Sequence, residues 1–259
     1  MDNSVFLTKA WMILSVSCLS CHAVANPQTD CRNFVDQVNS QSYKWDKSEI
    51  AKKLPIDGNR FQAFLVDHLP VCHILFIERN EERNPIKIRI VLFKREKSEL
   101  RLEASGAFPI DDSVGNPAES SFKGASKYPF QNSAFVLRLN ATWSISGGGF
   151  GMGSDDSYYI WVDNNKLRPI FQMSDTGSSE YVTTGRDGCR DITQSQSQLK
   201  YIHKPQNSGW PDLIVETRET KYTECGTNAK KLPGDIKRVH KTQRKFVWSG
   251  ERYEMTLKP

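Results

Sequence analysis

The chain has 259 residues, a formal net charge of +5, 38% hydrophobic residues and 25% charged residues. These values exclude a collagen-like, low-complexity or wholly disordered chain, and the length is enough for one large or two modest domains with a buried core. The mild positive charge does not by itself require a polyanionic partner.

The first segment has the pattern of a secretory signal peptide. Lys9 precedes a short apolar run, which ends in the small-residue pattern Ala23-Val24-Ala25 and the breaker pair Asn26-Pro27. The run is too short to span about 30 Å of hydrocarbon. We therefore predict that residues 1–25 are a signal peptide cleaved after Ala25, and that the protein is exported to the periplasm or the extracellular space.

Export changes the interpretation of the cysteines that remain after cleavage, which are Cys31, Cys72, Cys189 and Cys225. In an oxidising compartment an even number of cysteines indicates disulfides, with three possible connectivities for this set. The simplest connectivity closes the two shorter loops, Cys31–Cys72 and Cys189–Cys225. A zinc site would require close C-x-x-C pairs. We expect structural disulfides, no metal and no cofactor.

Residues 26–105 are predicted to form an N-terminal α+β region. Asp30 can cap a short helix that continues to Val38, and a second short helix is plausible at Asp46–Leu54. Periodicity does not decide between helix and strand for Phe61–Leu69. Three apolar or alternating segments then predict strands, at His73–Glu78, Ile86–Arg95 and Glu99–Ala104.

Residues 106–132 are rich in glycine and proline and predict a linker or long loop, and residues 133–259 an antiparallel β domain. Seven strands are predicted there, at Ala134–Ser146, Ser157–Asp163, Leu167–Ser174, Gln198–His203, Leu213–Thr223, Arg244–Ser249 and Tyr253–Leu257. The predicted fold class is mainly β, with antiparallel sheets arranged as a sandwich, barrel or small propeller and a short helical N-terminal region.

The glycine-rich run at residues 147–153 has two interpretations. It can be a flexible hairpin loop between two strands. It can also be a mobile loop that presents Phe150 and Met152 to a protein partner.

A basic stretch at residues 230–245 also has two interpretations. Its cations can form a patch for an anionic envelope surface, or they can guard a solvated edge strand against aggregation. Export and the small number of interleaved aromatics argue against nucleic acid. The cations are Lys230, Lys231, Lys237, Arg238, Lys241, Arg244 and Lys245.

Two short segments resemble known families. The segment Gly209–Val215 resembles the closing half of an FG-GAP or VCBS-type repeat, which implies a β architecture; the acidic calcium ligands of that family are absent except for Asp212. The string S-G-x-x-Y at Ser249, Gly250 and Tyr253 is similar to a loop of periplasmic lysozyme inhibitors. That resemblance, and the related group of interbacterial immunity proteins, implies a loop that enters the cleft of a hydrolase.

These observations predict an exported binding protein, and the role that we expect is that of an inhibitor or immunity protein that blocks a cell-wall hydrolase or toxin. Its partner-binding residues would be Ser249, Gly250 and Tyr253, or Phe150 and Met152. The alternative is a structural or accessory envelope protein that binds an anionic surface through the basic stretch. We predict no enzymatic activity, although a hydrolase built from Asp155, Asp156 and Asp175 remains a further alternative.

Overall fold

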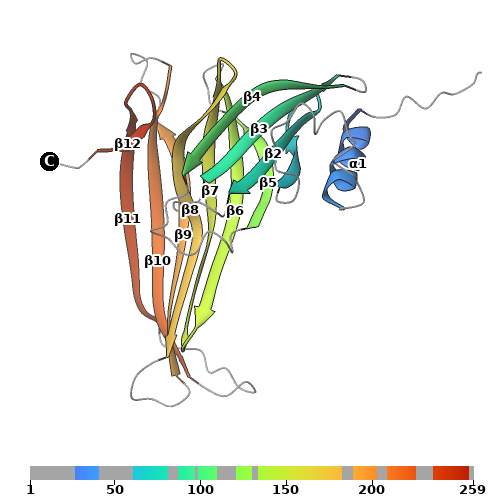
Figure 1. Cartoon of the computed structure of the whole chain (residues 1–259). Helices are drawn as coiled ribbons and strands as arrows, with labels where there is room; N and C mark the ends of the chain where they lie inside the picture. Colours follow the sequence, from blue (N-terminus) through green and yellow to red (C-terminus); the bar gives the residue numbers. More distant parts are fainter. Residues whose placement is uncertain are drawn as a thin grey trace, which may run out of the picture.

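A computed structural model describes residues 27–40, 61–80, 87–96, 99–109, 121–129, 134–182, 189–202, 209–225 and 236–256. One short helix precedes a series of strands, of which β6 to β11 are the longest (Figure 1). The elements are α1 (Pro27–Asn39), β1 (Phe61–Asp67), β2 (His73–Asn80), β3 (Lys87–Glu96), β4 (Glu99–Pro109), β5 (Ser121–Tyr128), β6 (Phe135–Gly147), β7 (Phe150–Asp163), β8 (Lys166–Val182), β9 (Cys189–Ile202), β10 (Asp212–Cys225), β11 (Ile236–Trp248) and β12 (Tyr253–Met255).

Eight of the strands close into a mixed barrel, in the order β8-β4-β3-β2-β1-β5-β6-β7 and back to β8. The mainly β fold class is thus confirmed, and the barrel is the arrangement found. Most neighbours are antiparallel, as expected, but β1–β5 and β4–β8 are parallel pairs. The remaining strands, β9 to β12, continue the sheet outward from β8.

Alternation along the strands builds the barrel core. In β2, Leu75 and Ile77 lie in a buried cluster with Ile90, Leu92 and other apolar residues from the strands of the barrel. The intervening Ile74 and Phe76 belong to a second cluster, which they share with α1. Since successive side chains of a strand point to opposite faces, the first cluster fills the barrel and the second covers its outer wall.

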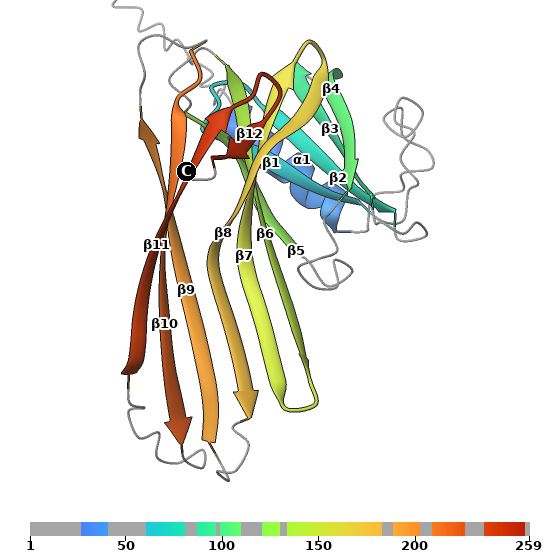
Figure 2. The ribbon, with the colours of Figure 1, turned by 90° about the vertical axis from the view of Figure 1, so that its left-hand side faces the viewer.

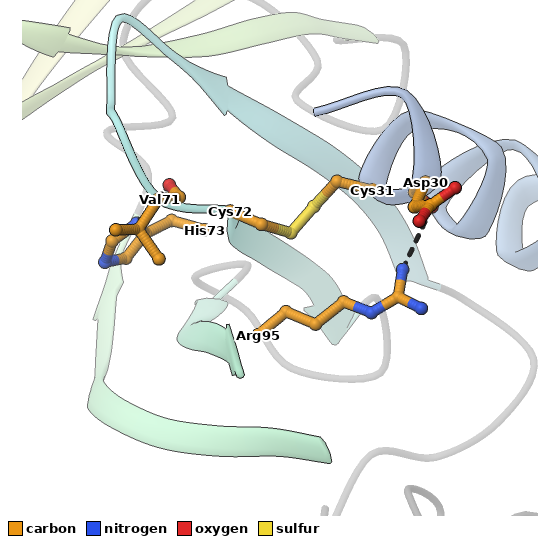
Figure 3. The surroundings of a disulfide bond; sticks show 6 residues. All are labelled: Asp30, Cys31, Val71, Cys72, His73 and Arg95. Carbon is orange, nitrogen blue, oxygen red and sulfur yellow. Dashed lines mark hydrogen bonds between the residues drawn. A yellow bond between two sulfur atoms is a disulfide. The ribbon is translucent and has the colours of Figure 1, made fainter. Parts of the chain in front are cut away.

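A disulfide and side-chain hydrogen bonds add to the apolar packing of α1 against the barrel. A disulfide joins Cys31 to Cys72, whose Cα atoms are 6.1 Å apart (Figure 3). The Asn39 side chain accepts a hydrogen bond from the amide of Ala63 at 2.9 Å and donates one to the Ala63 carbonyl at 2.8 Å. The Arg95 guanidinium donates to the Asp30 carbonyl at 2.9 Å. The second disulfide joins Cys189 to Cys225 across β9 and β10. Both predicted pairings are therefore present, and disulfides are typical of an oxidising, exported compartment.

The long strands run out of the barrel in one direction and form an extension (Figure 2). We call it the distal sheet; it consists of residues 142–147, 150–155, 176–182, 189–198, 216–225 and 236–243 of β6 to β11. At its barrel end, a third buried cluster packs apolar residues of β6, β7 and β8 against β10 and β12, including Tyr159, Phe171, Leu213 and Tyr253.

Two expectations about local structure are corrected. Residues 106–132 do not separate two sheets, because β4 extends to Pro109 and β5 is a barrel strand between β1 and β6. The glycine run does join two strands as a hairpin, but its unpaired part is shorter than expected: β6 and β7 pair up to Gly147 and Phe150, which leaves only Gly148 and Gly149 as the turn. Phe61–Asp67 is a strand, and the helix predicted at Asp46–Leu54 lies outside the described residues, as does the signal segment. No helix in the described ranges is long and apolar enough to cross a membrane.

Candidate binding surfaces of the distal sheet

The register of the distal sheet aligns one residue from each of six strands in a transverse row. The row is Thr142, Asp155, Thr176, Gln196, Arg218 and Lys241, each directly opposite the next. Residues that are directly opposite share a face of the sheet. We call this the outer face. The inner face carries Trp143 and Ile145, which continue the alternation of the core residues Leu139 and Ala141 along β6.

A polar groove crosses the outer face. It is a hollow of about 590 Å³, and its lining includes Thr142, Ser144, Thr176, Ser178, Gln194, Gln196, Arg218 and Thr220. A second hollow of about 680 Å³ continues from it across β9, β10 and β11 and shares Gln196 and Arg218 with the first. The outer face therefore offers a continuous trough of hydroxyl, amide and guanidinium groups.

Small residues form the floor of the trough. Ser144, Gly153 and Ser178 are direct cross-strand neighbours on the outer face. A Cβ at Gly153 would lie 3.0 Å from the carbonyl oxygen of Trp143, so the strands approach closely there. Because glycine has no side chain, the alternating glycines of β7 leave the outer face of the hairpin without bulky groups. The residues between them carry large side chains on the inner face.

Towards one end of the row, the Asp155 carboxylate is bound by three hydrogen-bond donors. Asp155 accepts hydrogen bonds from Thr142, from Thr176 at 3.0 Å and from the Lys123 ammonium at 2.9 Å. The hydrogen bonds from Thr142 and Lys123 lower the pKa of Asp155 to about 2. This end of the trough therefore carries a balanced ion pair.

At the other end of the row, two cations lie side by side. Arg218 and Lys241 are directly opposite each other on β10 and β11. Neither has an ion pair among the described residues, whereas the nearby Glu216 is bound by Lys200 at 2.6 Å. Like charges directly opposite each other in a sheet are destabilising. This end of the trough is therefore an uncompensated positive site.

The inner face carries an exposed apolar cluster at the end of the β6–β7 hairpin. Phe150, Met152, Tyr181 and Val182 are 39%, 38%, 49% and 53% exposed. The Phe150 and Tyr181 rings stack with centroids 6.4 Å apart, and the Tyr181 hydroxyl lies 3.6 Å from the Met152 sulfur. We call these four residues the tip cluster. Phe150, Met152 and Tyr181 lie on the inner face, whereas Val182 follows Tyr181 in β8 and points to the outer face; its amide donates to the Gly149 carbonyl at 2.9 Å. The structure thus places the predicted Phe150 and Met152 together, on a paired hairpin.

The predicted site around Ser249 has a different character. Tyr253 is only 6% exposed, its hydroxyl donates to the Pro211 carbonyl at 3.0 Å, and its ring packs against Phe171, Trp210 and Trp248. Ser249 closes its own turn, because its amide and hydroxyl both donate to the Arg252 carbonyl. Tyr253 is therefore a packing residue of the third cluster, which corrects its expected place on a binding surface. Gly250 has a φ of 107°, as this turn requires.

The described basic residues of β11 do not form one patch. Arg238 and Arg244 lie on the inner face, and Lys241 lies on the outer face with Lys245. Lys245 is bound by the buried Asp212 at 2.9 Å, which also gives the FG-GAP-like aspartate a structural partner. The side chain of Lys237 and both Lys230 and Lys231 lie outside the described residues.

The three aspartates of the hydrolase alternative all contribute to the lining of one hollow of about 410 Å³, but their carboxylates have different surroundings. Asp155 and Asp156 are consecutive residues of β7 and point to opposite faces. Asp175 accepts hydrogen bonds from Ser157 and from Arg138, the latter at 3.0 Å. Burial raises the pKa of Asp156, against the effect of hydrogen bonds such as that from Ser154. No group of three potential metal-ligating side chains occurs in the described part of the chain.

Comparison of the chain with protein-family models, with curated proteins and with solved structures finds no match. The sequence reasoning found Phe150 and Met152 but missed Tyr181, Arg218 and Gln196. Alternation in Gln194-Ser195-Gln196-Ser197-Gln198 is the one local signal for the trough, since it places the amides on a single face of a strand.

Proposed function

We propose that this protein is an exported binding protein that contacts a protein partner through the tip cluster. The observation that carries the proposal is the contiguous exposure of Phe150, Met152, Tyr181 and Val182 at the far end of a projecting sheet. Aromatic residues and methionine are enriched in the cores of protein interfaces. A cluster of this kind at a protruding end has a shape that can enter a concave partner surface.

The tip is preorganised for such contact. Gly148 and Gly149 have φ values of 55° and 87°, which a tight two-residue hairpin turn requires. The stacked pair Phe150–Tyr181 joins β7 to β8, so the rings are held by two paired strands. Ordering these side chains before binding reduces the entropy lost on association.

The partner class that we propose is a cell-wall hydrolase or toxin, with the protein acting as its inhibitor or immunity protein. Export after cleavage of residues 1–25 would bring the protein to the compartment where such enzymes act. A concave catalytic cleft is the complement that a protruding apolar hairpin fits. The proposal assigns the contact to the β6–β7 hairpin and not to the Ser249–Tyr253 turn, whose tyrosine is buried.

The test compares three immobilised forms of residues 26–259: the unaltered chain, a Phe150→Ser/Met152→Ser variant and a Leu102→Ser control. Leu102 is an apolar residue of β4 that is 54% exposed and lies away from the tip. Loss of interface anchors costs about 2 kcal/mol or more. We expect the unaltered chain and the control to retain an envelope protein that cleaves peptidoglycan, and the tip variant to retain at least tenfold less.

The retained hydrolase is then assayed with each form added in increasing amounts. Inhibition by the unaltered chain and the control, but not by the tip variant, supports the proposal. The proposal is wrong if the tip variant captures and inhibits as well as the control, or if no peptidoglycan-cleaving protein is retained by any form.

A further inference from the structure

We propose that the trough on the outer face binds an anionic, hydroxyl-rich ligand, namely a glycan chain bearing carboxylate, sulfate or phosphate groups. This site is separate from Phe150, Met152 and Tyr181 of the tip cluster, because those three side chains point to the inner face and the trough residues of β7 and β8 point to the outer face. The inference therefore does not depend on the proposed protein partner.

The charge distribution of the trough points to an anion. Arg218 and Lys241 lie directly opposite each other and lack an ion pair among the described residues. Two carboxylates of the trough already form ion pairs with other lysines, Glu216 with Lys200 and Asp155 with Lys123. Arg218 lines both hollows, so a ligand in either of them would meet its guanidinium. Guanidinium groups bind carboxylate, sulfate and phosphate oxygens through paired, charge-assisted hydrogen bonds.

The remaining lining specifies a ligand with many hydroxyl groups. Gln194, Gln196 and Thr220 surround Arg218 on the outer face, with Thr176 and Ser178 on the neighbouring strand. Amide and hydroxyl side chains both donate and accept hydrogen bonds, which is what the hydroxyls of a sugar require. An apolar peptide or acyl chain would find no complementary side chain in this lining.

The shape favours a chain over a single small molecule. The two hollows share Gln196 and Arg218 and together cross the sheet from β6 to β11. Six strands spaced about 4.8 Å apart span roughly 24 Å, several times the size of one sugar ring. Nucleic acid fits less well, because a single strand binds by stacking its bases on aromatic side chains. Trp143 belongs to the lining of the first hollow, but its side chain is buried and points to the inner face.

The first experiment measures binding of four probes to residues 26–259 by calorimetry at 0.15 M salt. The probes are polygalacturonate, dextran sulfate, neutral dextran and polyphosphate. We expect at least one of the two acidic glycans to bind at least tenfold more tightly than neutral dextran and than polyphosphate. Equal binding of polyphosphate would show that charge alone is recognised, and absence of binding by both acidic glycans would also overturn the inference.

The second experiment uses two charge-matched variants. Arg218→Gln/Lys241→Gln should weaken acidic-glycan binding at least tenfold. Arg238→Gln/Arg244→Gln removes the same charge from the opposite face of the sheet and should change it less than twofold. Similar losses in both variants would assign binding to the overall charge of the sheet edge and would overturn the proposed site.

A third pair of variants tests the trough without changing charge. Ser178→Tyr fills the floor of the outer face, whereas Ser179→Tyr places the same ring on the inner face. We expect at least a tenfold loss for Ser178→Tyr and less than a twofold change for Ser179→Tyr, with circular dichroism confirming that both are folded. Equal behaviour of the two would contradict the location. Retained glycan binding by Phe150→Ser/Met152→Ser would show that the site stands independently of the proposed function.

Discussion

Two adjacent aspartates show how strongly the side of a strand determines the chemistry of a residue. Asp155 lies on the outer face with three hydrogen-bond donors, and these hold its pKa at about 2. Asp156 lies on the inner face, is 5% exposed, and has a pKa raised by burial. The charge of Asp155 thus stabilises the fold, whereas the charge of Asp156, the next residue of β7, lowers its stability.

The two carboxylates should therefore contribute to stability with opposite pH dependence. Hydrogen bonds lower the folded-state pKa of Asp155 below its ordinary value, so its contribution to stability is present above about pH 4 and is lost as the pH falls towards 2. Asp155→Asn should remove this loss and lower the free energy of unfolding at pH 7 by about 1 kcal/mol. Asp156 has a raised pKa, so its contribution is lost as the pH rises through that value.

Urea unfolding from pH 2 to pH 7 measures both effects. Asp156→Asn should leave the stability at pH 7 unchanged or higher, because no buried charge then forms. The same pH profile for both variants would contradict the assignment of the two residues to opposite faces.

At the scale of elements, closure of the barrel depends on a short seam between β4 and β8. These strands share a single register pair, Ser105 with Lys166, and the Ser105 amide donates to the Asn165 carbonyl at 3.1 Å. A Cβ at the neighbouring Gly106 would lie only 2.3 Å from the carbonyl oxygen of Leu167. The glycine that the sequence places at the start of a linker is therefore a point of close backbone approach.

Gly106→Ala should force this seam apart. Overpacking of this kind costs about 1–3 kcal/mol. We expect the free energy of unfolding in urea to fall by that amount. Gly124→Ala in β5 is the matched control, because a Cβ there meets nothing within 4 Å, and its effect should stay within about 1 kcal/mol. Equal stability of the two variants would mean that the seam does not constrain the fold.

The elements that the sequence predicts well are those with an apolar pattern. His73–Glu78 and Leu213–Thr223 were located to within a few residues, because their alternating or continuous apolar side chains are buried. The first half of β9 was missed because residues 189–197 are mostly polar on both faces, so periodicity carries little signal there. The parallel pairs β1–β5 and β4–β8 join segments far apart in sequence, and no local pattern encodes them.

The same distinction applies to the candidate sites. Phe150 and Met152 stand out as apolar residues within a glycine run, and they were predicted as a pair. Arg218 and Lys241 are ordinary charged residues in the sequence and become neighbours only through the register of β10 and β11. The trough can therefore be recognised only from the strand pairing and not from the composition of the sequence.

At the scale of the whole molecule, the barrel and the distal sheet are stabilised in different ways. The three buried clusters fill the barrel, lie between its outer wall and α1, and lie at its junction with the extension. In the first half of β9, by contrast, most side chains are exposed or half-buried. The far ends of β9 and β10 are held by ladder hydrogen bonds and by the Cys189–Cys225 disulfide. Elements with few buried contacts open locally at a lower free energy than a core does.

This difference predicts separate responses to loss of each disulfide. Disulfides that close loops of 36 and 41 residues contribute about 4 kcal/mol each, or roughly a thousandfold in an opening equilibrium. In Cys189→Ser/Cys225→Ser, we expect amide hydrogen exchange at 189–196 and 218–225 to accelerate by up to that factor, with exchange at 74–77 unchanged. In Cys31→Ser/Cys72→Ser, hydrogen exchange should instead accelerate in α1, because the Cys31–Cys72 disulfide joins α1 to the barrel. Mass spectrometry of peptic fragments distinguishes the two patterns. Uniform acceleration in both variants would show that barrel, helix and distal sheet unfold as one cooperative unit, and that the two proposed binding faces do not rest on a separately stabilised extension.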